Sequence, residues 1–357
     1  MALKYSCKDR TFQISCIVLL VLFGVFKSFS ASGQLIEDDS EESRFSILPV
    51  PTFGYEPETN FYIGAATLMT YRFGDQRLSN ATVEATYTLN KQSILSLEYE
   101  LFPNKRFALK GEWIKKNFPD LYWSFQSPWV PGEAYTLRSI GGYNSLLYVS
   151  QSNRAIMFGP YFEWWSFDVA QHLSNGVLDN EVATKELSYM ALGADAVIDS
   201  RDQVLNPSKG IFTLLRYKYF SNNVSSAELQ GRIYKGLGRR FLLAGQIVSQ
   251  LSDISEPLQL YRYGNSTYLR GYYQGNFRTS NAFTSQIELR TNVIGRFGVV
   301  TFAGMGQLWH MGINHRLYTY GGGLRFKIDR ESNVNIRFDY ALGKNSSGFY
   351  IGFGEAF

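Results

Sequence analysis

The sequence predicts an all-β protein, a transmembrane antiparallel β-barrel of sixteen strands. From Ser46 onward, apolar and polar residues alternate with a period of two, which is the pattern of strands with two unlike faces. The alternating stretches are about ten residues long, which suits a tilted membrane crossing. Their connections alternate between short and long, as the turns and loops of a membrane barrel do. A soluble sandwich shares the periodicity, but its strands are usually shorter.

Residues 1–33 are expected to be a secretory signal peptide. Lys4, Lys8 and Arg10 precede an apolar run at 12–26, and the small residues SFSASG follow. Charged, apolar and small residues in this order are typical of an export signal. The run is shorter than the about 20 residues that a membrane-spanning helix needs.

The rest of the chain is expected to hold a short acidic periplasmic lead-in, 34–45, and the barrel, 46–357. Cys7 and Cys16 both lie in the predicted signal, so no disulfide or thiol chemistry is expected after its removal. The signal carries four basic residues and one acidic residue, and its loss lowers the net charge from +4 to +1. A nucleic-acid partner is therefore not expected.

Each predicted strand has an apolar and a polar face. In the stretch 334–341, four apolar residues alternate with Asn335, Arg337, Asp339 and Ala341. The sixteen strands are expected to begin near residues 46, 60, 79, 92, 104, 136, 152, 187, 209, 224, 239, 281, 296, 316, 333 and 347. Short connections are expected at 103–106, 236–239, 292–296 and 329–333, and long ones at 115–135, 165–186 and 251–280. An even count places both ends in the periplasm, and fourteen or twelve strands are the alternatives.

The long connection before the twelfth strand contains YLRGYYQGNFR, residues 268–278. Its Arg270, Gly271 and Tyr272 match an Arg-Gly-Phe/Tyr motif in type and position. On this motif the chain resembles the bacterial surface antigen barrels, the BamA/TamA-type superfamily of outer-membrane assembly factors. The resemblance implies that the loop folds back into the lumen and that the arginine pairs with Glu288 on the twelfth strand. A guanidinium in a narrow lumen needs such a carboxylate, and a glycine permits close backbone approach.

The thirteenth strand departs from the pattern of that family. It reads FAGMG, in which Phe302 and Gly306 match a Phe-x-Asp-x-Gly pattern while Gly304 replaces the aspartate. We therefore expect Arg270 to depend chiefly on Glu288. Restoring the aspartate at position 304 is expected to strengthen the attachment of Arg270 inside the lumen, provided that the lumen has room.

Two further stretches are similar to that family. DSRDQVLNPSKG resembles its turn between strands eight and nine, and a structural role is expected for Asp199, Arg201, Asp202, Pro207 and Gly210. The final stretch GFYIGFGEAF resembles a C-terminal β-signal, with Phe353 and Phe357 as its aromatic positions. Glu355 is a departure, since a hydrophobic residue is usual there.

Charged residues on the polar faces are expected to pair with one another inside the barrel. The bases are Arg216, Lys218, Arg232, Arg325, Lys327 and Arg337, and the acids are Glu84, Glu98, Glu100, Glu228, Glu288 and Asp339. The only histidines, His172, His310 and His315, fall in no nucleophile or metal pattern, so no enzyme, metal site or cofactor is expected. The glycine run 321–323 has no strand–turn–helix context for a phosphate loop.

The resemblance also bears on function. Relatives carry periplasmic POTRA domains, for which this chain has no room, so it resembles a barrel-only branch. That branch implies a bacterial outer-membrane protein that assists the insertion or translocation of protein or lipid near a weak seam between the first and last strands. Outer-membrane lipids, and protein partners in the outer membrane or periplasm, are the expected contacts.

Pro49 and Pro51 each remove a ladder donor from the first strand. The alternative is a passive pore or a structural barrel serving a partner, which a stable full-length seam would favour.

Overall fold

The computed structural model describes residues 45–357 except 75–76, 127, 204–205, 239 and 329–334. The predicted signal peptide, 1–33, and residues 34–44 of the predicted lead-in lie outside the described residues. Phe45, the last residue of that lead-in, begins the first strand.

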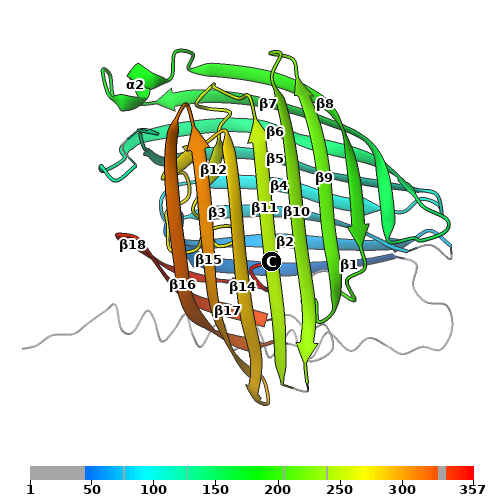
Figure 1. Ribbon diagram of the computed structural model, residues 1–357. Helices are drawn as coiled ribbons and strands as arrows, with labels where there is room; N and C mark the ends of the chain where they lie inside the picture. The colour runs from blue at the N-terminus through cyan, green and yellow to red at the C-terminus, as the bar shows by residue number, and fades with distance from the viewer. Residues whose placement is uncertain (1–44, 75–76, 127, 204–205, 239, 329–334) are drawn as a thin grey trace, which may run out of the picture. The chain divides into compact units, whose positions relative to one another are not determined.

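Sixteen antiparallel strands close into a barrel in which neighbours follow the chain order (Figure 1). The strands are β1 (Phe45–Glu56), β2 (Asn60–Arg72), β3 (Leu78–Thr88), β4 (Ser93–Leu101), β5 (Phe107–Tyr122), β6 (Glu133–Val149), β7 (Ile156–Gln171), β8 (Glu186–Asp199), β9 (Gly210–Phe220), β10 (Ser225–Leu237), β11 (Phe241–Ser252), β14 (Asn281–Ile294), β15 (Phe297–His310), β16 (Ile313–Lys327), β17 (Asn335–Gly343) and β18 (Ser346–Phe353). The predicted count of sixteen is confirmed, and every predicted start lies within four residues of the observed one. Period-two alternation was therefore a sufficient guide to where each strand begins.

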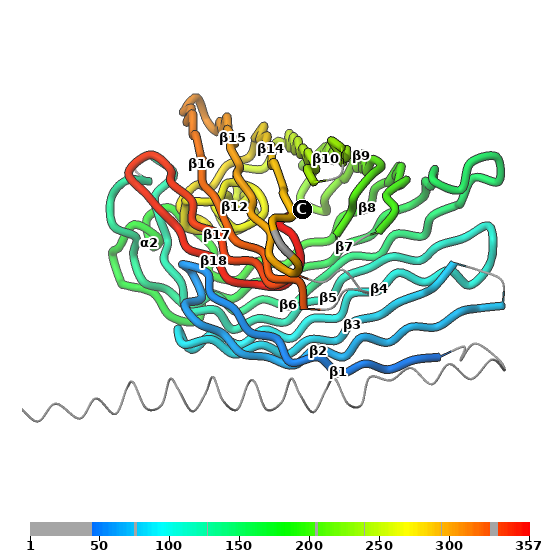
Figure 2. Tube along the Cα trace, turned by 90° about the horizontal axis from the view of Figure 1, so that it is seen from below, coloured from blue at the N-terminus to red at the C-terminus, as the bar shows by residue number. Residues whose placement is uncertain are grey.

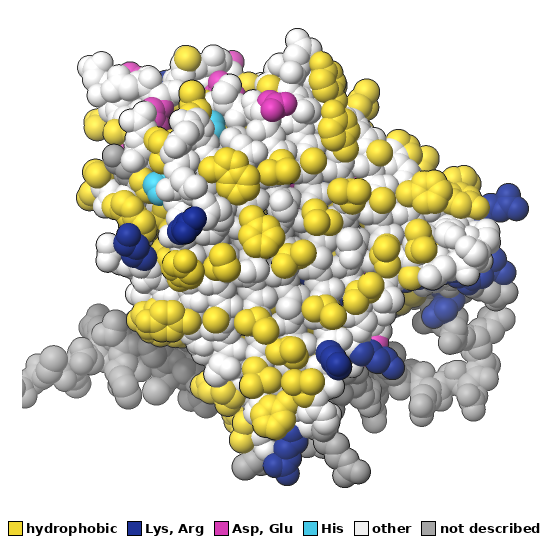
Figure 3. Space-filling model, in the orientation of Figure 1, with side chains coloured by type: hydrophobic (Ala, Val, Ile, Leu, Met, Phe, Trp, Pro, Cys, Tyr) yellow, Lys and Arg dark blue, Asp and Glu magenta, His cyan; other side chains and the backbone are white. Residues whose placement is uncertain are grey.

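The two faces of the wall differ as the alternation predicts. On β8, Met190 and Leu192 point outward and are more than half exposed, whereas Tyr189 and Ala191 point into the lumen and are buried. Across the face seen in Figure 3, apolar side chains cover the middle of the wall, and several of the lysines and arginines gather toward its lower and right-hand edges. The outward surface is thus an apolar belt around a polar, packed interior.

The two longest connections between wall strands, β7–β8 and β11–β14, lie at the same end of the barrel. We call the end with the β2–β3, β4–β5, β6–β7, β8–β9, β10–β11, β14–β15 and β16–β17 connections the turn end, and the opposite end the loop end. Two predicted loops at the loop end are wrong in extent, because β5 and β6 together pair through most of 115–135, and β7 continues to Gln171. The apolar alternation fades there, but backbone groups still need hydrogen-bond partners, so the ladder continues beyond the apolar belt.

The connection between β11 and β14 folds into the lumen (Figures 1 and 2). It contains a small two-stranded sheet of β12 (Tyr261–Tyr263) and β13 (Phe277–Thr279). Its buried side chains pack with those of β14, β15 and β16 in a cluster of Tyr263, Leu269, Tyr272, Phe277, Ala282, Leu308 and Leu317. We call residues 253–280 the inner loop.

Helix is scarce in the part of the chain that the structure describes. The connection between β7 and β8 holds a short helix, α2 (Val177–Glu181). No described helix has the length and apolar character needed to cross a bilayer.

Candidate functional site

Arg270, at the tip of the inner loop, is completely buried and held by two carboxylates. One of its terminal nitrogens donates to Glu288 on β14, and the other donates to Asp339 on β17 at 3.0 Å. The guanidinium carbon lies 3.6 Å above the ring of Phe302 on β15, a close cation–π contact. The structure therefore places the arginine between three strands of the barrel wall.

The residues after Arg270 fix the path of the loop backbone. Gly271 has φ of +96°, and a Cβ there would lie 3.0 Å from the backbone of Leu342, so only glycine fits. Its N–H donates to the hydroxyl of Tyr350 on β18 at 2.8 Å. Tyr272 is buried and donates to the carbonyl of Tyr318 at 2.9 Å. The Arg-Gly-Tyr stretch thus contacts β14, β15, β16, β17 and β18.

Arg270 belongs to a closed ring of three arginines and three carboxylates, which we call the charge ring. Glu288 also accepts from Arg290 at 2.8 Å, and Asp339 also accepts from Arg325 at 2.6 Å. Glu355 completes the circuit, lying 2.7 Å from Arg325 and 3.7 Å from Arg290. Each charge touches two opposite charges, so the ring is neutral as a whole. All six side chains are at most 8% exposed.

The expectation that Arg270 depends chiefly on Glu288 is wrong, because Asp339 supplies a second carboxylate. Position 304 also has no room for the aspartate of the family pattern. A Cβ on Gly304 would lie 2.8 Å from Gln286 Cγ, 2.9 Å from the carbonyl of Ser285 and 3.0 Å from Thr319 Cγ2. The second carboxylate therefore comes from another strand. The other two motif residues contact the loop, since Phe302 lies under Arg270 and Gly306 leaves space for Leu269.

The C-terminal stretch leaves the barrel wall and enters the lumen. β18 ends at Phe353, and Gly354 turns with φ of +75°. Glu355 then joins the charge ring, while Phe357 packs in a buried cluster with Tyr234, Ala244 and Ala356. Of the two expected β-signal aromatics, Phe353 stays in the wall and Phe357 does not. The polar departure at Glu355 is thus explained, because this side chain faces arginines in the lumen.

This inward turn leaves the closure between the first and last strands very short. β1 pairs with β2 at twelve positions but with β18 at one, Tyr55 opposite Ile351. Outside the ladder, the rings of Phe53 and Phe353 lie 5.0 Å apart, centre to centre. Toward the turn end, no β18 residue in the described part of the chain pairs with 45–54.

The two prolines of β1 fall where the missing ladder would run. Continuing the register of Tyr55 opposite Ile351 would set Pro51 against Glu355 and Pro49 against Phe357. These prolines cannot donate hydrogen bonds, and the residues that would face them lie in the lumen instead. Both sides of the closure therefore disfavour a longer ladder.

Comparison with known proteins identifies the barrel. The Omp85 superfamily domain matches residues 59–357. The chain belongs to the Omp85 superfamily. No curated protein matches the sequence.

Solved structures agree with this Omp85 assignment at the level of the fold. BamA from Haemophilus ducreyi lacking POTRA domains 1-3 superposes with a TM-score of 0.62 at 11% identity, over 87% of this chain and 70% of that chain. CdiB from Acinetobacter baumannii gives 0.58 at 13% identity, over 87% and 60%, and CdiB from Escherichia coli gives 0.59 at 10% identity, over 88% and 63%. The chain thus spans less than two thirds of the CdiB chains. Within the described residues it forms the barrel alone.

The predicted turn motif lies at the turn end of this Omp85 barrel and has a structural geometry. Asp199 accepts two hydrogen bonds from the Arg201 side chain, at 2.9 and 2.8 Å. Pro207 is buried, and Gly210 has φ of +107° where a Cβ would lie 2.4 Å from a backbone oxygen. Asp202 accepts from the N–H groups of Gln203, Ser208 and Lys209.

These contacts set the ionisation of Asp202. Burial acts to raise the pKa of its carboxyl, but the hydrogen bonds from Ser208 and its neighbours outweigh burial and hold this pKa below its usual value. The carboxylate form therefore stabilises the turn above the ordinary aspartate pKa, and this contribution is lost as the pH falls through the lowered value.

Several lumenal charges have partners other than those expected. Arg216 makes a two-pronged pair with Asp195, with contacts of 2.7 and 2.8 Å, and Lys218 lies 3.3 Å from Glu163. Neither carboxylate was among the expected acids. Glu100 pairs with Lys110 at 2.7 Å. Three further expected residues make other contacts: Glu84 accepts from Thr52 and Thr86, Glu228 accepts from Gln230, and Arg232 lies over Phe212.

The histidines lie at the loop end. His172 is 3.2 Å from Asp179, and His315 packs edge-on against Phe125 and Phe277. His310 is 2.9 Å from the hydroxyl of Ser280, a contact that the sequence did not indicate. Both partners of that contact are buried.

Proposed function

We propose that this Omp85 barrel resides in the bacterial outer membrane, with the turn end in the periplasm and the loop end outside. An apolar outward belt supports the membrane location. An even number of strands sets both ends of the barrel domain at the turn end, and in membrane barrels of this kind the short turns lie on the periplasmic side. Its surroundings are then outer-membrane lipids, with protein partners in the membrane or the periplasm.

Within that membrane, we propose that the barrel assists the insertion or translocation of protein or lipid by opening between β1 and β18. The observation that carries this proposal is the single residue pair that joins the two strands. Unpaired backbone groups are costly in lipid, which is why membrane barrels close completely. A free stretch of β1 offers those groups to an incoming strand, as in other cases of strand addition to a sheet edge.

The interior supports this proposal over a passive pore. The inner loop occupies the lumen, and its arginine is fixed by two carboxylates. A pore needs a continuous water-filled path, whereas here loop side chains pack against the wall. A route between the strands does not require the loop to leave.

We also propose a role without catalysis. Of the three histidines, only His310 hydrogen-bonds a serine hydroxyl, that of Ser280. Both residues are buried. A substrate could not reach that hydroxyl without rearrangement of the inner loop. The remaining two histidines contact an aspartate and aromatic rings.

Depletion of the protein, followed by quantitative outer-membrane proteomics and lipid analysis, tests the proposal. The expected result is a reduced level of a defined set of other barrels, or of an outer-leaflet lipid, restored by the wild-type chain. If depletion changes only the uptake of small solutes and leaves membrane composition unchanged, the barrel is a pore.

A further inference from the structure

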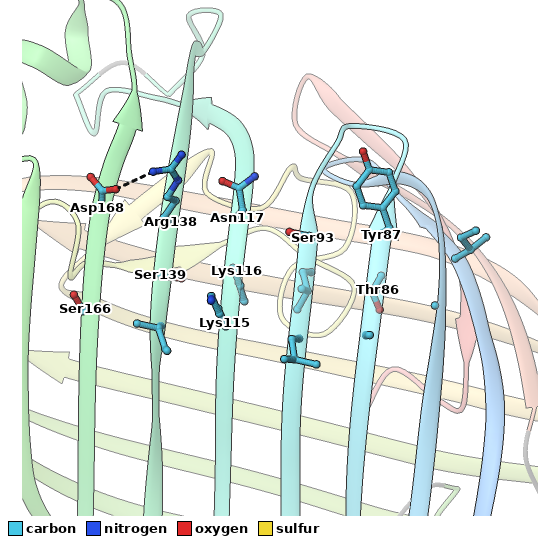
Figure 4. Close-up of a pocket in the computed structure, with 16 residues that line it drawn as sticks. Thr86, Tyr87, Ser93, Lys115, Lys116, Asn117, Arg138, Ser139, Ser166 and Asp168 are labelled. Carbon is cyan, nitrogen blue, oxygen red and sulfur yellow. Dashed lines mark ion pairs between the residues drawn. The ribbon is translucent and has the colours of Figure 1, made fainter.

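A row of polar side chains crosses the outward face of five strands near the loop end. The strand register sets Ser93 beside Asn117, Asn117 beside Arg138, and Arg138 beside Asp168, with Glu186 next on β8. Figure 4 shows the first four in line across β4, β5, β6 and β7. Directly opposed residues have Cβ atoms about 5 Å apart, so these side chains form one continuous polar strip.

A second cation lies one row closer to the middle of the membrane. Lys115 faces outward on β5, opposite Ile140 on β6, and is therefore the diagonal neighbour of Arg138. Diagonal neighbours are about 7–8 Å apart, which long side chains span. Within the described part of the chain, Lys115 has no ion-pair or hydrogen-bond partner. Arg138 has one distant partner, Asp168 at 3.7 Å, and its side chain is 64% exposed.

The height of these cations matches the edge of the apolar belt. A strand tilted by about 40° rises about 2.5 Å along the barrel axis per residue. Arg138 lies ten residues from Tyr148 at the turn end of β6, so it sits about 25 Å higher, which is the height of an apolar belt. Lys115 lies eight residues from Phe107 on β5, about 5 Å below that edge by the same arithmetic.

The cations border a hollow with an apolar floor. It has a volume of about 930 Å³, and Ile63, Leu95, Tyr87 and Ile140 contribute its outward-facing apolar side chains. A second outward hollow, of about 690 Å³ between β9 and β16, has no charged residue facing outward. Of these two outward hollows, only the one over β4–β7 carries outward-facing charged residues.

We propose that this hollow binds a phosphate-bearing lipid of the outer leaflet. Lys115 and Arg138 would pair with one lipid phosphate, Asn117 and Ser93 would donate to its other oxygens, and acyl chains would lie over Ile140 and Leu95. A cation facing hydrocarbon costs most at mid-membrane and little at the interface, so an anionic headgroup offsets the cost of Lys115. Lipid rather than free phosphate is the ligand, because the apolar floor adjoins the cations. Asp168 and Glu186 border the site on its β7 side. Their negative charges repel a phosphate, so the phosphate is expected on the side of Arg138 that faces Lys115.

Native mass spectrometry of the full chain in detergent micelles tests this site. The probes are diphosphoryl lipid A and the same lipid with both phosphates removed. The Lys115→Gln/Arg138→Gln variant is expected to retain diphosphoryl lipid A at least about tenfold less than wild type, since both charge-assisted contacts to the phosphate are lost. Wild type should retain the dephosphorylated lipid as weakly as the variant does.

Arg316→Gln is the matched control, because Arg316 also faces outward near the loop end but hydrogen-bonds Gln307 and lies outside the β4–β7 hollow. It should retain lipid as wild type does. The charge-preserving variant Lys115→Arg/Arg138→Lys should also bind, which separates loss of charge from misfolding. Equal retention by wild type and the double glutamine variant, equal loss in the control, or full displacement by inorganic phosphate would overturn the site. Binding in micelles does not depend on cellular location, so this result is independent of the proposed function.

Discussion

Arg270 connects more parts of the barrel than any other side chain described above. It joins the inner loop to β14 and β17 and rests on a ring from β15. Each carboxylate that Arg270 contacts also pairs with a second arginine. Removing Arg270 therefore leaves the charge ring with a net charge of −1, but it leaves neither carboxylate without a cationic partner. The energetic consequences at single residues follow from this arrangement.

The first prediction concerns coupling within the charge ring. Arg270→Ala should lower the free energy of unfolding by about 3–5 kcal/mol, as loss of one partner of a buried pair does. Glu288→Gln should also destabilise, and the double variant should be about 0.5–3 kcal/mol more stable than the sum of the two losses predicts, because neutrality is restored. Denaturant-induced unfolding in lipid vesicles, followed by heat-modifiable mobility, gives these values.

The partly exposed pair Lys110–Glu100 serves as the control, with a contact of 2.7 Å. Its coupling should be about 0–1 kcal/mol. Additive losses for Arg270 and Glu288 would mean that the ring does not act as a unit.

The second prediction reverses an expectation from the sequence. Gly304→Asp should destabilise the barrel by about 1–3 kcal/mol, because its Cβ would overlap the backbone of Ser285 and the side chain of Gln286. Gly236→Asp is the control, since a Cβ there meets no atom within 4 Å. A gain in unfolding free energy for Gly304→Asp would show that the lumen accommodates a fourth carboxylate beside the charge ring.

At the scale of elements, β18 and the residues after it determine how β1 is closed. Glu355 is drawn into the charge ring, so the chain turns inward at Gly354 and leaves Pro49 and Pro51 without strand partners. The same ring that holds the inner loop therefore holds the last residues away from β1.

The third prediction tests this link. Cysteines at Phe53 and Phe353, in a background whose only native cysteines are Cys7 and Cys16, should crosslink incompletely. Adding Pro49→Val, Pro51→Val and Glu355→Leu should raise the yield, because the final residues are released from the lumen and β1 regains its donors. Cysteines at Ile287 and Ala303, opposed on β14 and β15, should crosslink fully in both backgrounds. An unchanged yield in the triple variant would separate the charge ring from the closure.

The elements themselves could largely be predicted from the sequence. Strand starts follow from period two, which depends only on local pattern. The ends of β5 and β7 could not be predicted from the sequence, because backbone pairing continues where the apolar alternation has stopped. Asp339 and Glu355 escaped prediction as ring partners, since they lie 69 and 85 positions from Arg270 and only the strand register and the inward turn bring them together. The sequence shows that Glu355 departs from the C-terminal pattern, but only the structure shows the reason, which is that its side chain pairs with arginines in the lumen.

At the scale of the whole molecule, the barrel combines a closely packed interior with an incomplete closure between β1 and β18. The inner loop and the charge ring stabilise β14 to β18 from within, so the barrel can keep its shape without a full ladder between β1 and β18. The proposed opening between β1 and β18 would leave the rest of the wall paired, as the proposed insertion or translocation through the wall requires.

The fourth prediction tests that claim most directly, by locking the closure in cells depleted of the wild-type protein. A variant with cysteines at Tyr55 and Ile351, the one opposed pair, should fail to restore outer-membrane composition when oxidised and should recover when the disulfide is reduced. The variant with cysteines at Ile287 and Ala303 should restore it in both states. Full restoration by the locked β1–β18 variant would contradict the account, because the barrel would then work without opening there.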